Sequence, residues 1–362
     1  MRIAFIAPLV TAIAEPQRGG SQAILADIAS GLTSRGHPVT VFAADGSAIP
    51  GVDVVEAGID PAQLATTIFR EGRQAPSSPE AEAAFLRVAD LVWARSFDVV
   101  HNHAFDVPAV RAFPGGGVSV VHTVHLPPTA EMAGALRERF DPEESARAVV
   151  TVSRAQGRAW SAARVPNVVI PNGVPVSDIP WSARPGSGAL FAGRFSREKG
   201  AVDAIRIAQQ AGMPIAIAGW AYDRRYTERD LAPLMAGPGV AFLGSLDRRE
   251  LWRRMASAAV VLCPSLWEEP FGLVAAEAQA AGTPVVGYRR GALSEVVAEG
   301  RTGFLVESGD INAGAEAVGR AAGLDRATCR RHAEGSLDIR ATLDGLEGLY
   351  ASLVGSAEVG RG

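Results

Sequence analysis

Short runs of β-branched residues alternate with longer Ala- and Leu-rich stretches along most of this chain, and that alternation constrains the fold most. Residues 3–7 and 39–43 are predicted to be strands, and residues 21–34 between them have the apolar spacing of a helix. Near-continuous apolar strands joined by helices are typical of parallel sheets covered on both faces. Further strands are expected in this half of the chain at 52–56, 99–101, 118–123, 149–152 and 168–171.

A second alternation of the same kind follows a segment rich in Pro and Gly. Residues 174–187 include Pro175, Pro180 and Pro185 and show no apolar period, which favours a linker. The 362 residues suffice for more than one domain, each with a core of its own. After the linker, strands are expected at 189–192, 215–218, 240–242, 260–263, 285–287 and 304–306.

The fold class that follows is α/β, with two Rossmann-like doubly wound parallel-sheet domains facing a central cleft. We expect an N-terminal domain in 1–173, a linker in 174–187, a C-terminal domain in 188–338 and a C-terminal helix in 339–362. That helix has one apolar face and could pack against either domain, including back on the N-terminal one. Ligands of such folds bind at the carboxyl ends of strands, so polar residues there are site candidates.

Composition argues against several classes of protein. Acidic residues outnumber basic ones by 39 to 35 and no Lys/Arg-rich block occurs, so nucleic acid is not expected as a partner. Cys263 and Cys329 lie far apart, which provides neither a disulfide framework nor a Cys-based zinc site. No apolar run is long enough to span a membrane. A cytoplasmic monomer or homodimer without stable membrane insertion is expected.

The most informative segment follows the strand expected at 260–263. Glu269 lies in a loop, and Glu277, after seven intervening residues, lies inside the next helix. Backbone amides at the start of that helix, around Phe271, Gly272 and Leu273, make a site suited to a diphosphate. The two carboxylates could accept hydrogen bonds from sugar and ribose hydroxyls. Alternatively, Glu269 is an ordinary solvated charge near a helix start.

Two further sets of residues lie at expected strand ends in the first half. Gly19 and Gly20 precede the helix at 21–34, where backbone amides can approach a phosphate, although a Gly pair there is often only a loop feature. Four histidines, with Asp106, form either a metal site and hence a hydrolase, or a hydrogen-bonding rim. These histidines are His101, His103, His122 and His125.

Several motifs together resemble one enzyme family. The segment 269–277 resembles the E-x7-E signature of retaining glycosyltransferases with the GT-B fold, in particular family 4. The letters NGV at 172–174 resemble the PNGV turn of that family, and GR with KG at 193–200 resembles its G-R-x4-K-G phosphate loop. The letters GFLV at 303–306 resemble a late strand of the family. The resemblance covers essentially the whole chain, with the motifs in the order of the family.

The resemblance implies a retaining enzyme that moves a sugar from a UDP- or GDP-sugar to an acceptor hydroxyl, with no metal or other cofactor required. It implies an acceptor side in the N-terminal domain and a donor side in the C-terminal one. Because no basic amphipathic helix is visible, a small soluble acceptor or specialised metabolite is favoured over a cell-surface polysaccharide or glycolipid. A non-catalytic nucleotide-sugar-binding protein and the metal-dependent hydrolase are the alternatives of other classes.

The resemblance also implies roles for single residues at the sugar. It places His122 where a histidine positions the donor sugar or stabilises oxocarbenium charge, and it makes Glu269 a ligand of that sugar. Retention of configuration could arise by front-face attack, or by double displacement through a carboxylate such as Glu269. Gly19 and Gly20 would approach the diphosphate from the opposite wall.

The basic residues of the second half complete the predicted site. Arg194 and Lys199 match the phosphate ligands of the family and could stabilise the negative charge of the departing diphosphate. Lys199 is the one Lys among the 35 basic residues, since all others are Arg. By contrast, the cluster at 248–254 has acidic neighbours in Asp247 and Glu250, which favours a solvated helix face over a binding site.

Overall fold

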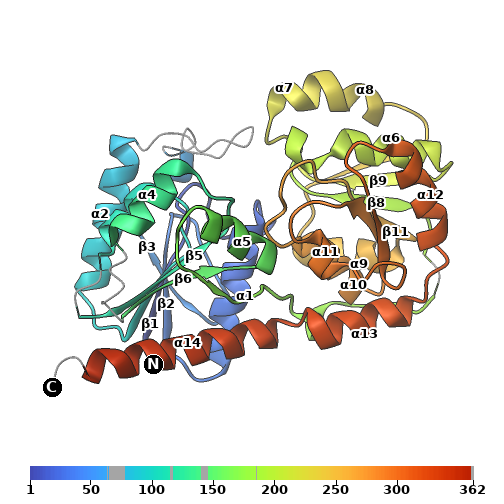
Figure 1. The fold of residues 1–362 in the computed structure, drawn as a ribbon. Helices are drawn as coiled ribbons and strands as arrows, with labels where there is room; N and C mark the ends of the chain where they lie inside the picture. Colours follow the sequence, from blue (N-terminus) through green and yellow to red (C-terminus); the bar gives the residue numbers. More distant parts are fainter. Residues whose placement is uncertain (63, 65–77, 115–116, 140–145, 185, 360–362) are drawn as a thin grey trace. The chain divides into compact units, whose positions relative to one another are not determined.

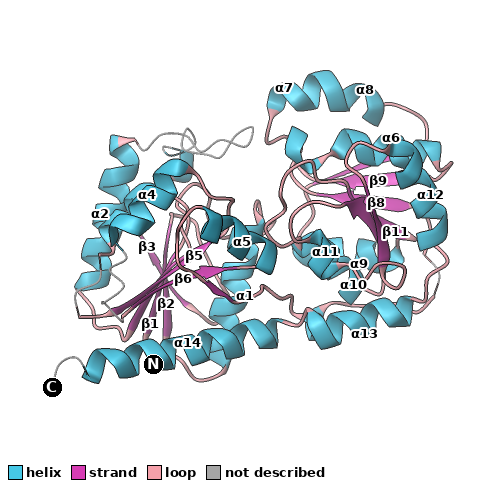
Figure 2. Cartoon of the chain, in the orientation of Figure 1, coloured by secondary structure: helices cyan, strands magenta, loops and turns pink. Residues whose placement is uncertain are grey.

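The computed structural model describes residues 1–362 except 63, 65–77, 115–116, 140–145, 185 and 360–362. The chain divides into two compact units, one made of Met1–Asn172 with Ile339–Gly362 and the other of Gly173–Asp338. In each unit helices flank a parallel sheet (Figures 1 and 2). The predicted α/β class with two doubly wound parallel sheets is confirmed.

The sheet of the first unit has seven strands in the order β3-β2-β1-β4-β5-β6-β7, and all neighbouring pairs are parallel. The order runs outward in both directions from β1 and β4, which is the doubly wound arrangement of Rossmann-like domains. β-branched residues fill these strands because they pack well on a pleated surface that is covered on both sides. The strands are β1 Ile3–Ile6, β2 Val39–Ala43, β3 Asp53–Glu56, β4 Val99–Asn102, β5 Ser119–Val124, β6 Arg147–Thr151 and β7 Val168–Val169.

The helices of the first unit bury the apolar stripes that their sequences predict. In α1, Ile24, Ile28 and Leu32 lie one helical turn apart and are all buried. These residues and the buried apolar residues of the other helices cover the faces of the sheet, where the core of the unit lies. The helices are α1 Gly20–Ser34, α2 Pro79–Trp93, α3 Val107–Ala112, α4 Ala130–Arg139, α5 Arg154–Ala162 and α14 Ile339–Val359.

The C-terminal helix α14 returns to the first unit. It contacts α1 and β5, and Tyr350 on its inner face is fully buried. The hydroxyl of Tyr350 lies 2.5 Å from Nδ1 of His101, and Thr342 donates a hydrogen bond of 2.8 Å to the carbonyl of Pro171. Of the two packing arrangements that the sequence allowed, the structure therefore has α14 on the first unit.

The sheet of the second unit has six parallel strands in the order β10-β9-β8-β11-β12-β13. Here the order reverses between β8 and β11, so the loops that follow these two strands lie side by side at one edge of the sheet. The strands are β8 Ala189–Ala192, β9 Ile215–Ala218, β10 Val240–Gly244, β11 Val260–Cys263, β12 Val285–Tyr288 and β13 Gly303–Val306.

The helices of the second unit enclose a core that includes Phe191, Ile205 and Leu262. The longer ones cover the faces of the sheet, and after β8 a 3₁₀ turn and a π turn occur in the connections. These elements are a 3₁₀ turn Arg197–Lys199, α6 Ala201–Gln210, α7 Arg224–Tyr226, a π turn Thr227–Leu231, α8 Ala232–Met235, α9 Arg248–Ser257, α10 Leu273–Ala280, α11 Leu293–Val296, α12 Ile311–Ala321 and α13 Arg326–Ser336.

The segment 174–187, expected as a linker, is attached to the second unit where the structure describes it. Val174 donates a backbone hydrogen bond of 2.8 Å to the carbonyl of Leu337. Two arginines of α13 donate to carbonyls of the segment, Arg326 to Ser182 at 2.7 Å and Arg330 to Ile179 at 3.0 Å. Regular structure in the segment is limited to a 3₁₀ turn at Val176–Asp178, as its prolines predict.

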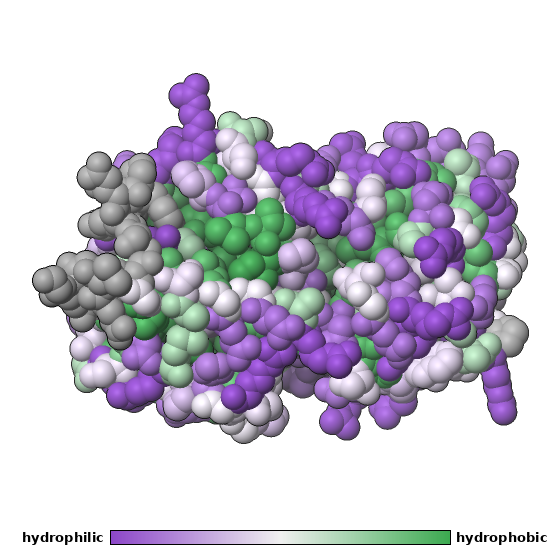
Figure 3. Space-filling model, turned by 60° about the horizontal axis from the view of Figure 1, so that its bottom comes forward, coloured by the Kyte–Doolittle hydropathy of each residue, from purple (hydrophilic) through white to green (hydrophobic). Residues whose placement is uncertain are grey.

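Apolar side chains are mostly enclosed in the two cores. The face of the molecule in Figure 3 is mainly hydrophilic, and hydrophobic residues gather where the surface is hollowed. Within the described part of the chain, no helix has the length and apolar character needed to cross a membrane. The large hydrophobic side chains that are exposed are Leu86, Trp93, Val168, Val169, Trp181, Phe242 and Leu266.

Candidate active site

The loop between β11 and α10 holds the residues for which an anion site is predicted. Gly272 adopts φ +100°, and a Cβ at this position would lie 2.8 Å from Leu293, so only glycine fits without strain. Leu273 then begins α10, whose first hydrogen bond runs from the amide of Ala276 to the carbonyl of Gly272. No side chain caps this helix. The amides of its first turn, next to the buried Phe271, are therefore suited to a ligand oxygen.

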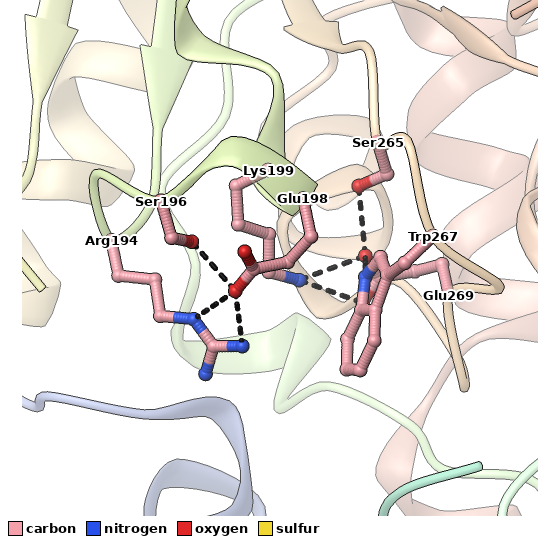
Figure 4. Close-up of polar contacts among 7 residues, drawn as sticks. All are labelled: Arg194, Ser196, Glu198, Lys199, Ser265, Trp267 and Glu269. Atoms are coloured by element: carbon pink, nitrogen blue, oxygen red, sulfur yellow. Dashed lines mark hydrogen bonds and ion pairs between the residues drawn. The ribbon is translucent and has the colours of Figure 1, made fainter. Parts of the chain in front are cut away.

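Glu269 and Lys199 form an ion pair next to this helix start (Figure 4). Nζ of Lys199 lies 2.8 Å from Oε2 and 3.1 Å from Oε1 of the carboxylate. Ser265 and Trp267 each donate a further hydrogen bond of 2.9 Å to Oε2. Burial raises the pKa of the Glu269 carboxyl, but the charge of Lys199 and these hydrogen bonds lower it more, and the net pKa lies below its ordinary value. Glu269 is therefore a fixed carboxylate rather than a solvated charge.

A second glycine explains how Lys199 reaches Glu269 across 70 residues of sequence. Gly200 adopts φ +72° directly after the 3₁₀ turn that carries Lys199. A Cβ on Gly200 would lie 2.0 Å from the carbonyl oxygen of Pro264, which follows β11. The two loops touch through backbone atoms there, because β8 and β11 are neighbours in the sheet.

Arg194 is held by a carboxylate and by aromatic rings. Its Nε and Nη2 donate hydrogen bonds of 3.2 and 2.9 Å to Oε1 of Glu198, which also accepts 2.7 Å from Ser196 (Figure 4). The guanidinium lies 4.6 Å from the ring centroid of Tyr222 and 5.8 Å from that of Trp267. Nζ of Lys199 lies 4.9 Å from the Trp267 ring as well. One indole thus contacts both predicted phosphate ligands, which the structure brings to a single place.

Glu277 is paired with a different cation. Nε and Nη2 of Arg248, the first residue of α9, both lie 3.0 Å from Oε1 of Glu277. Both side chains are largely buried, with exposed fractions of 12% for Arg248 and 7% for Glu277. The expectation of a solvated helix face is therefore wrong for Arg248, although Arg253 and Arg254 are exposed as that expectation requires.

The physical reason is the way α9 begins. The Asp247 side chain accepts a hydrogen bond of 2.8 Å from the amide of Glu250 and so caps the helix. Glu250 in turn pairs with Arg253 and Arg254 at 2.9 and 2.7 Å. The acidic neighbours are thus occupied by the cap and by other arginines, and Arg248 in the first turn is directed to α10, which packs on α9.

In the first unit, Gly19 and Gly20 lie at the N-terminus of the 15-residue helix α1. Gly19 is the N-cap residue in extended conformation, and no side chain caps the helix. Nearby, Ser21 donates a hydrogen bond of 2.9 Å to the side-chain oxygen of Gln22, whose amide nitrogen bonds to Thr11. No side chain caps this helix start, and a role of Gly19 and Gly20 at a phosphate stays a prediction.

His122 in β5 is buried and has an assignable tautomer. The amide of Ala104 donates 3.0 Å to Oδ1 of Asn102, which fixes the side-chain amide of Asn102. Its Nδ2 then donates across 3.1 Å to Nδ1 of His122. Burial, and next the charge of Arg147, lower the pKa of His122 to about 4. The imidazole is therefore neutral near pH 7, with its proton on Nε2.

The other histidines of the first unit bond to the core and to one another. His101 lies between Tyr350 and Thr123, at 2.5 and 2.6 Å, and His103 lies 3.1 Å from His125. Burial is the largest cause that lowers the pKa of each of these histidines, and that of His125 falls to about 4. Among the residues that the structure describes, no three His, Cys, Asp or Glu side chains are grouped as metal ligands would be.

A small pocket lies beside His122 within the first unit. Its lining includes the polar residues Asn102, His122, Thr123 and His125, and α4 and α5 contribute Leu136 and Trp160. No described residue that lines it carries a charged side chain. The space that it encloses is about 10 Å³, which is roughly enough for one water molecule.

Sequence reasoning missed several residues that hold the predicted ones in place. Glu198 lies inside the segment 193–200 and Trp267 lies two residues before Glu269, so proximity to a motif was the available signal. Asn102 follows a predicted strand next to His101, at a strand end. Arg248 gave no local signal, because its partner Glu277 is 29 residues away.

Two family models match the chain over successive segments. The model described as Glycosyltransferase Family 4 matches residues 18–178. The model described as Glycosyl transferases group 1 matches residues 187–332. The first segment lies mainly in the first unit and the second lies within the second unit.

Relatives from two Mycobacterium species match across most of the chain. The glycogen synthase of Mycobacterium tuberculosis (strain ATCC 25618 / H37Rv) is 31% identical, across 84% of this chain and 83% of that protein. The phosphatidyl-myo-inositol mannosyltransferase of Mycobacterium leprae (strain TN) is 29% identical, across 88% of this chain and 86% of that protein.

Solved structures show the same fold over nearly the whole length. Sucrose-phosphate synthase from Thermosynechococcus elongatus superposes with a TM-score of 0.79 at 19% identity, covering 98% of this chain and 100% of the other. Anabaena HepE in complex with UDP-glucose superposes with a TM-score of 0.73 at 21% identity, covering 97% and 100%. The chain therefore belongs to glycosyltransferase family 4, and its two parallel-sheet units make it a GT-B glycosyltransferase.

Proposed function

We propose that this glycosyltransferase moves a sugar, with retention of configuration and without a metal, from a nucleoside-diphosphate sugar to a hydroxyl of a small soluble acceptor. The observation that carries the proposal is the group formed by Lys199, Glu269 and the uncapped start of α10. It combines a cation and free amides for a diphosphate with a fixed carboxylate for sugar hydroxyls.

In this proposal, Lys199 and Arg194 stabilise the diphosphate as it departs. Breaking the bond between sugar and phosphate leaves negative charge on the phosphate, and fixed cations and amides stabilise that charge as it develops. Both cations are paired with carboxylates here, Lys199 with Glu269 and Arg194 with Glu198. A bound phosphate therefore takes over part of each pairing, which leaves Glu269 able to accept hydrogen bonds from the sugar.

His122 is proposed to act on the same sugar through its Nε2–H. A neutral imidazole donates one hydrogen bond there and adds no positive charge next to an oxocarbenium-like centre. For retention we favour front-face attack, in which the acceptor hydroxyl gives its proton to the departing phosphate. The alternative nucleophile, Glu269, already accepts hydrogen bonds from Lys199, Ser265 and Trp267, which weakens its attack on carbon.

The donor is proposed to be a UDP-sugar, and a GDP-sugar is the second candidate. The structural likeness to HepE with UDP-glucose supports the first choice. Gly19 and Gly20 at the start of α1 are proposed to contact the diphosphate as well.

The acceptor is proposed to be uncharged and small. The sequence supports this, because no basic amphipathic helix of the kind that binds a lipid surface is visible in it. Synthesis of a glycolipid or cell-surface polysaccharide is the second candidate, which the likeness to a phosphatidyl-myo-inositol mannosyltransferase favours.

The experiment is a thermal-shift panel of UDP, GDP, ADP and dTDP, followed by turnover assays with sugars of the nucleotide that stabilises most. We expect UDP to raise Tm and the matching UDP-sugar to be turned over equally with and without EDTA. No stabilisation by any of the four would contradict the donor site. Stabilisation without turnover of any donor would instead indicate a non-catalytic nucleotide-sugar-binding protein, and loss of turnover in EDTA would contradict metal independence.

A further inference from the structure

Arg248 has the geometry of a residue that sets the position of a carboxylate. Its Nε and Nη2 converge on a single oxygen, Oε1 of Glu277, at 3.0 Å each. Its guanidinium also lies 4.8 Å from the ring centroid of Trp252, one turn further along α9. A planar guanidinium that is held by a ring on one side and a carboxylate on the other has little freedom to turn.

Burial makes this pairing consequential for Glu277. The carboxylate belongs to a helix with a buried interior face, and 7% of its side chain is exposed. A buried carboxylate without a cation is strongly unfavourable, so it would take up a proton or turn away if Arg248 were absent. The charge and the direction of Glu277 therefore both depend on Arg248.

We propose that Arg248 is a positioning residue for the nucleoside half of the donor. By holding Oε1 of Glu277, it directs Oε2 to a ribose hydroxyl of the bound nucleotide. This inference rests on the proposed function, because it takes the donor to be a nucleoside-diphosphate sugar whose ribose Glu277 binds. Arg248 itself does not touch the ligand.

The role of Arg248 is distinguishable from that of a residue needed only for folding. A hydrogen bond from a ribose hydroxyl to a correctly held carboxylate is lost when the hydroxyls are removed from the ligand. The ratio between Kd for 2′,3′-dideoxy-UDP and Kd for UDP therefore measures that contact. A merely structural defect would weaken both ligands alike and leave the ratio unchanged.

The experiment measures both Kd values by calorimetry for the wild type and for Arg248→Met, Arg248→Lys and Arg253→Met. We expect a ratio of roughly 10 to 100 for the wild type, as for one hydrogen bond to a charged group. In Arg248→Met the ratio should fall to near 1. Arg248→Lys keeps the positive charge but cannot contact Oε1 through two nitrogens, so it should give an intermediate ratio. Arg253→Met is the control, because Arg253 lies on the same helix but pairs at the surface with Glu250.

Kinetics add a second readout with the donor sugar. Because the ribose does not react, its contact stabilises the ground state and the transition state equally, and the variants should raise KM for the donor with kcat nearly unchanged.

A ratio of the two Kd values that is above 10 in the wild type and persists in both Arg248 variants would overturn the inference. A wild-type ratio of 1 would also overturn it. Failure of the wild type to bind any nucleoside diphosphate would be a different result, which overturns the proposed function itself. If Arg248→Met does not fold, the ratio of the two Kd values in Arg248→Lys tests the inference.

Discussion

At the scale of single residues, three cations of the candidate site are each paired with a carboxylate. Lys199 is bound to Glu269, Arg194 to Glu198 and Arg248 to Glu277. Ion pairs that are largely buried contribute little net stability compared with apolar packing, so net stability alone does not account for these three pairs.

Replacing Lys199 by Arg should slow turnover although the charge is kept. A planar guanidinium is wider than an ammonium and cannot make the same contact with a phosphate between Trp267 and Glu269. Loss of one charge-assisted hydrogen bond corresponds to roughly one to two decades in rate. Steady-state kinetics with the donor test this, and Arg206→Lys, an exchange at an exposed position of α6, is the control. Wild-type rate and donor affinity in the Lys199 variant would remove Lys199 from the site.

The stability of the first unit should depend on pH through His125 and Asp106 in opposite directions. Burial lowers the pKa of His125 from 6.5 to about 4, so the unfolded chain binds its proton first and stability falls as pH decreases below 6.5. Burial raises the pKa of Asp106 from 3.8 to about 7, so the folded chain binds its proton first and stability falls as pH increases from about 4 to 7.

Urea unfolding at pH 7 and pH 5 checks both signs. The loss of unfolding free energy from pH 7 to pH 5 should be smaller in His125→Gln than in the wild type, by on the order of 2 kcal/mol. In Asp106→Asn the loss should be larger than in the wild type. The same pH dependence in all three proteins would show that neither group titrates as its burial indicates.

At the scale of elements, the site depends on close contact between the loops after β8 and β11. Gly200 allows that contact, because a Cβ on it would meet the Pro264 carbonyl at 2.0 Å. Gly212, at the end of α6, has a similar φ of +64° and nothing within 4 Å of a Cβ. The two glycines thus differ in surroundings and share their backbone conformation.

Gly200→Ala should therefore be more destabilising than Gly212→Ala. Both variants carry the strain of a left-handed alanine, about 1–2 kcal/mol, and Gly200→Ala must also separate the two loops. We expect it to lose donor affinity as well, since Lys199 would move away from Glu269. Unfolding free energies and Kd for UDP measure the difference, and equal losses in both variants would mean that the loops do not need this contact.

The sequence predicted the elements well because the strands of a parallel sheet are apolar on both faces and are bounded by glycine and proline. The expected strand at 260–263, for example, is β11 within the same bounds. The sequence also singled out Glu269, Lys199 and the start of α10, which the structure brings together, because these lie in short motifs at strand ends. The partner of each charge depends on tertiary packing, and local charge patterns therefore gave the wrong environment for Arg248. The Pro-rich composition of 174–187 likewise predicted irregular structure but not its hydrogen bonds to α13.

At the scale of the whole molecule, the two units carry different parts of the predicted chemistry. The second unit holds Lys199, Glu269 and Glu277 with the helix start of α10, and the first holds His122 with its uncharged pocket. The helix α14 belongs to the first unit although it follows the second in sequence. We propose that a nucleoside diphosphate binds in the second unit, at the start of α10.

Hydrogen exchange of the backbone amides at 273–275, measured with and without UDP, shows whether the diphosphate binds there. These amides lie in the first turn of α10, where no side chain caps the helix, and phosphate oxygens would accept hydrogen bonds from them. With UDP at about 100 times its Kd, their exchange should slow by up to about 100-fold, and the slowing should be much smaller in Lys199→Met at the same UDP concentration. UDP binding that leaves exchange at 273–275 unchanged would show that the diphosphate does not bind at the start of α10.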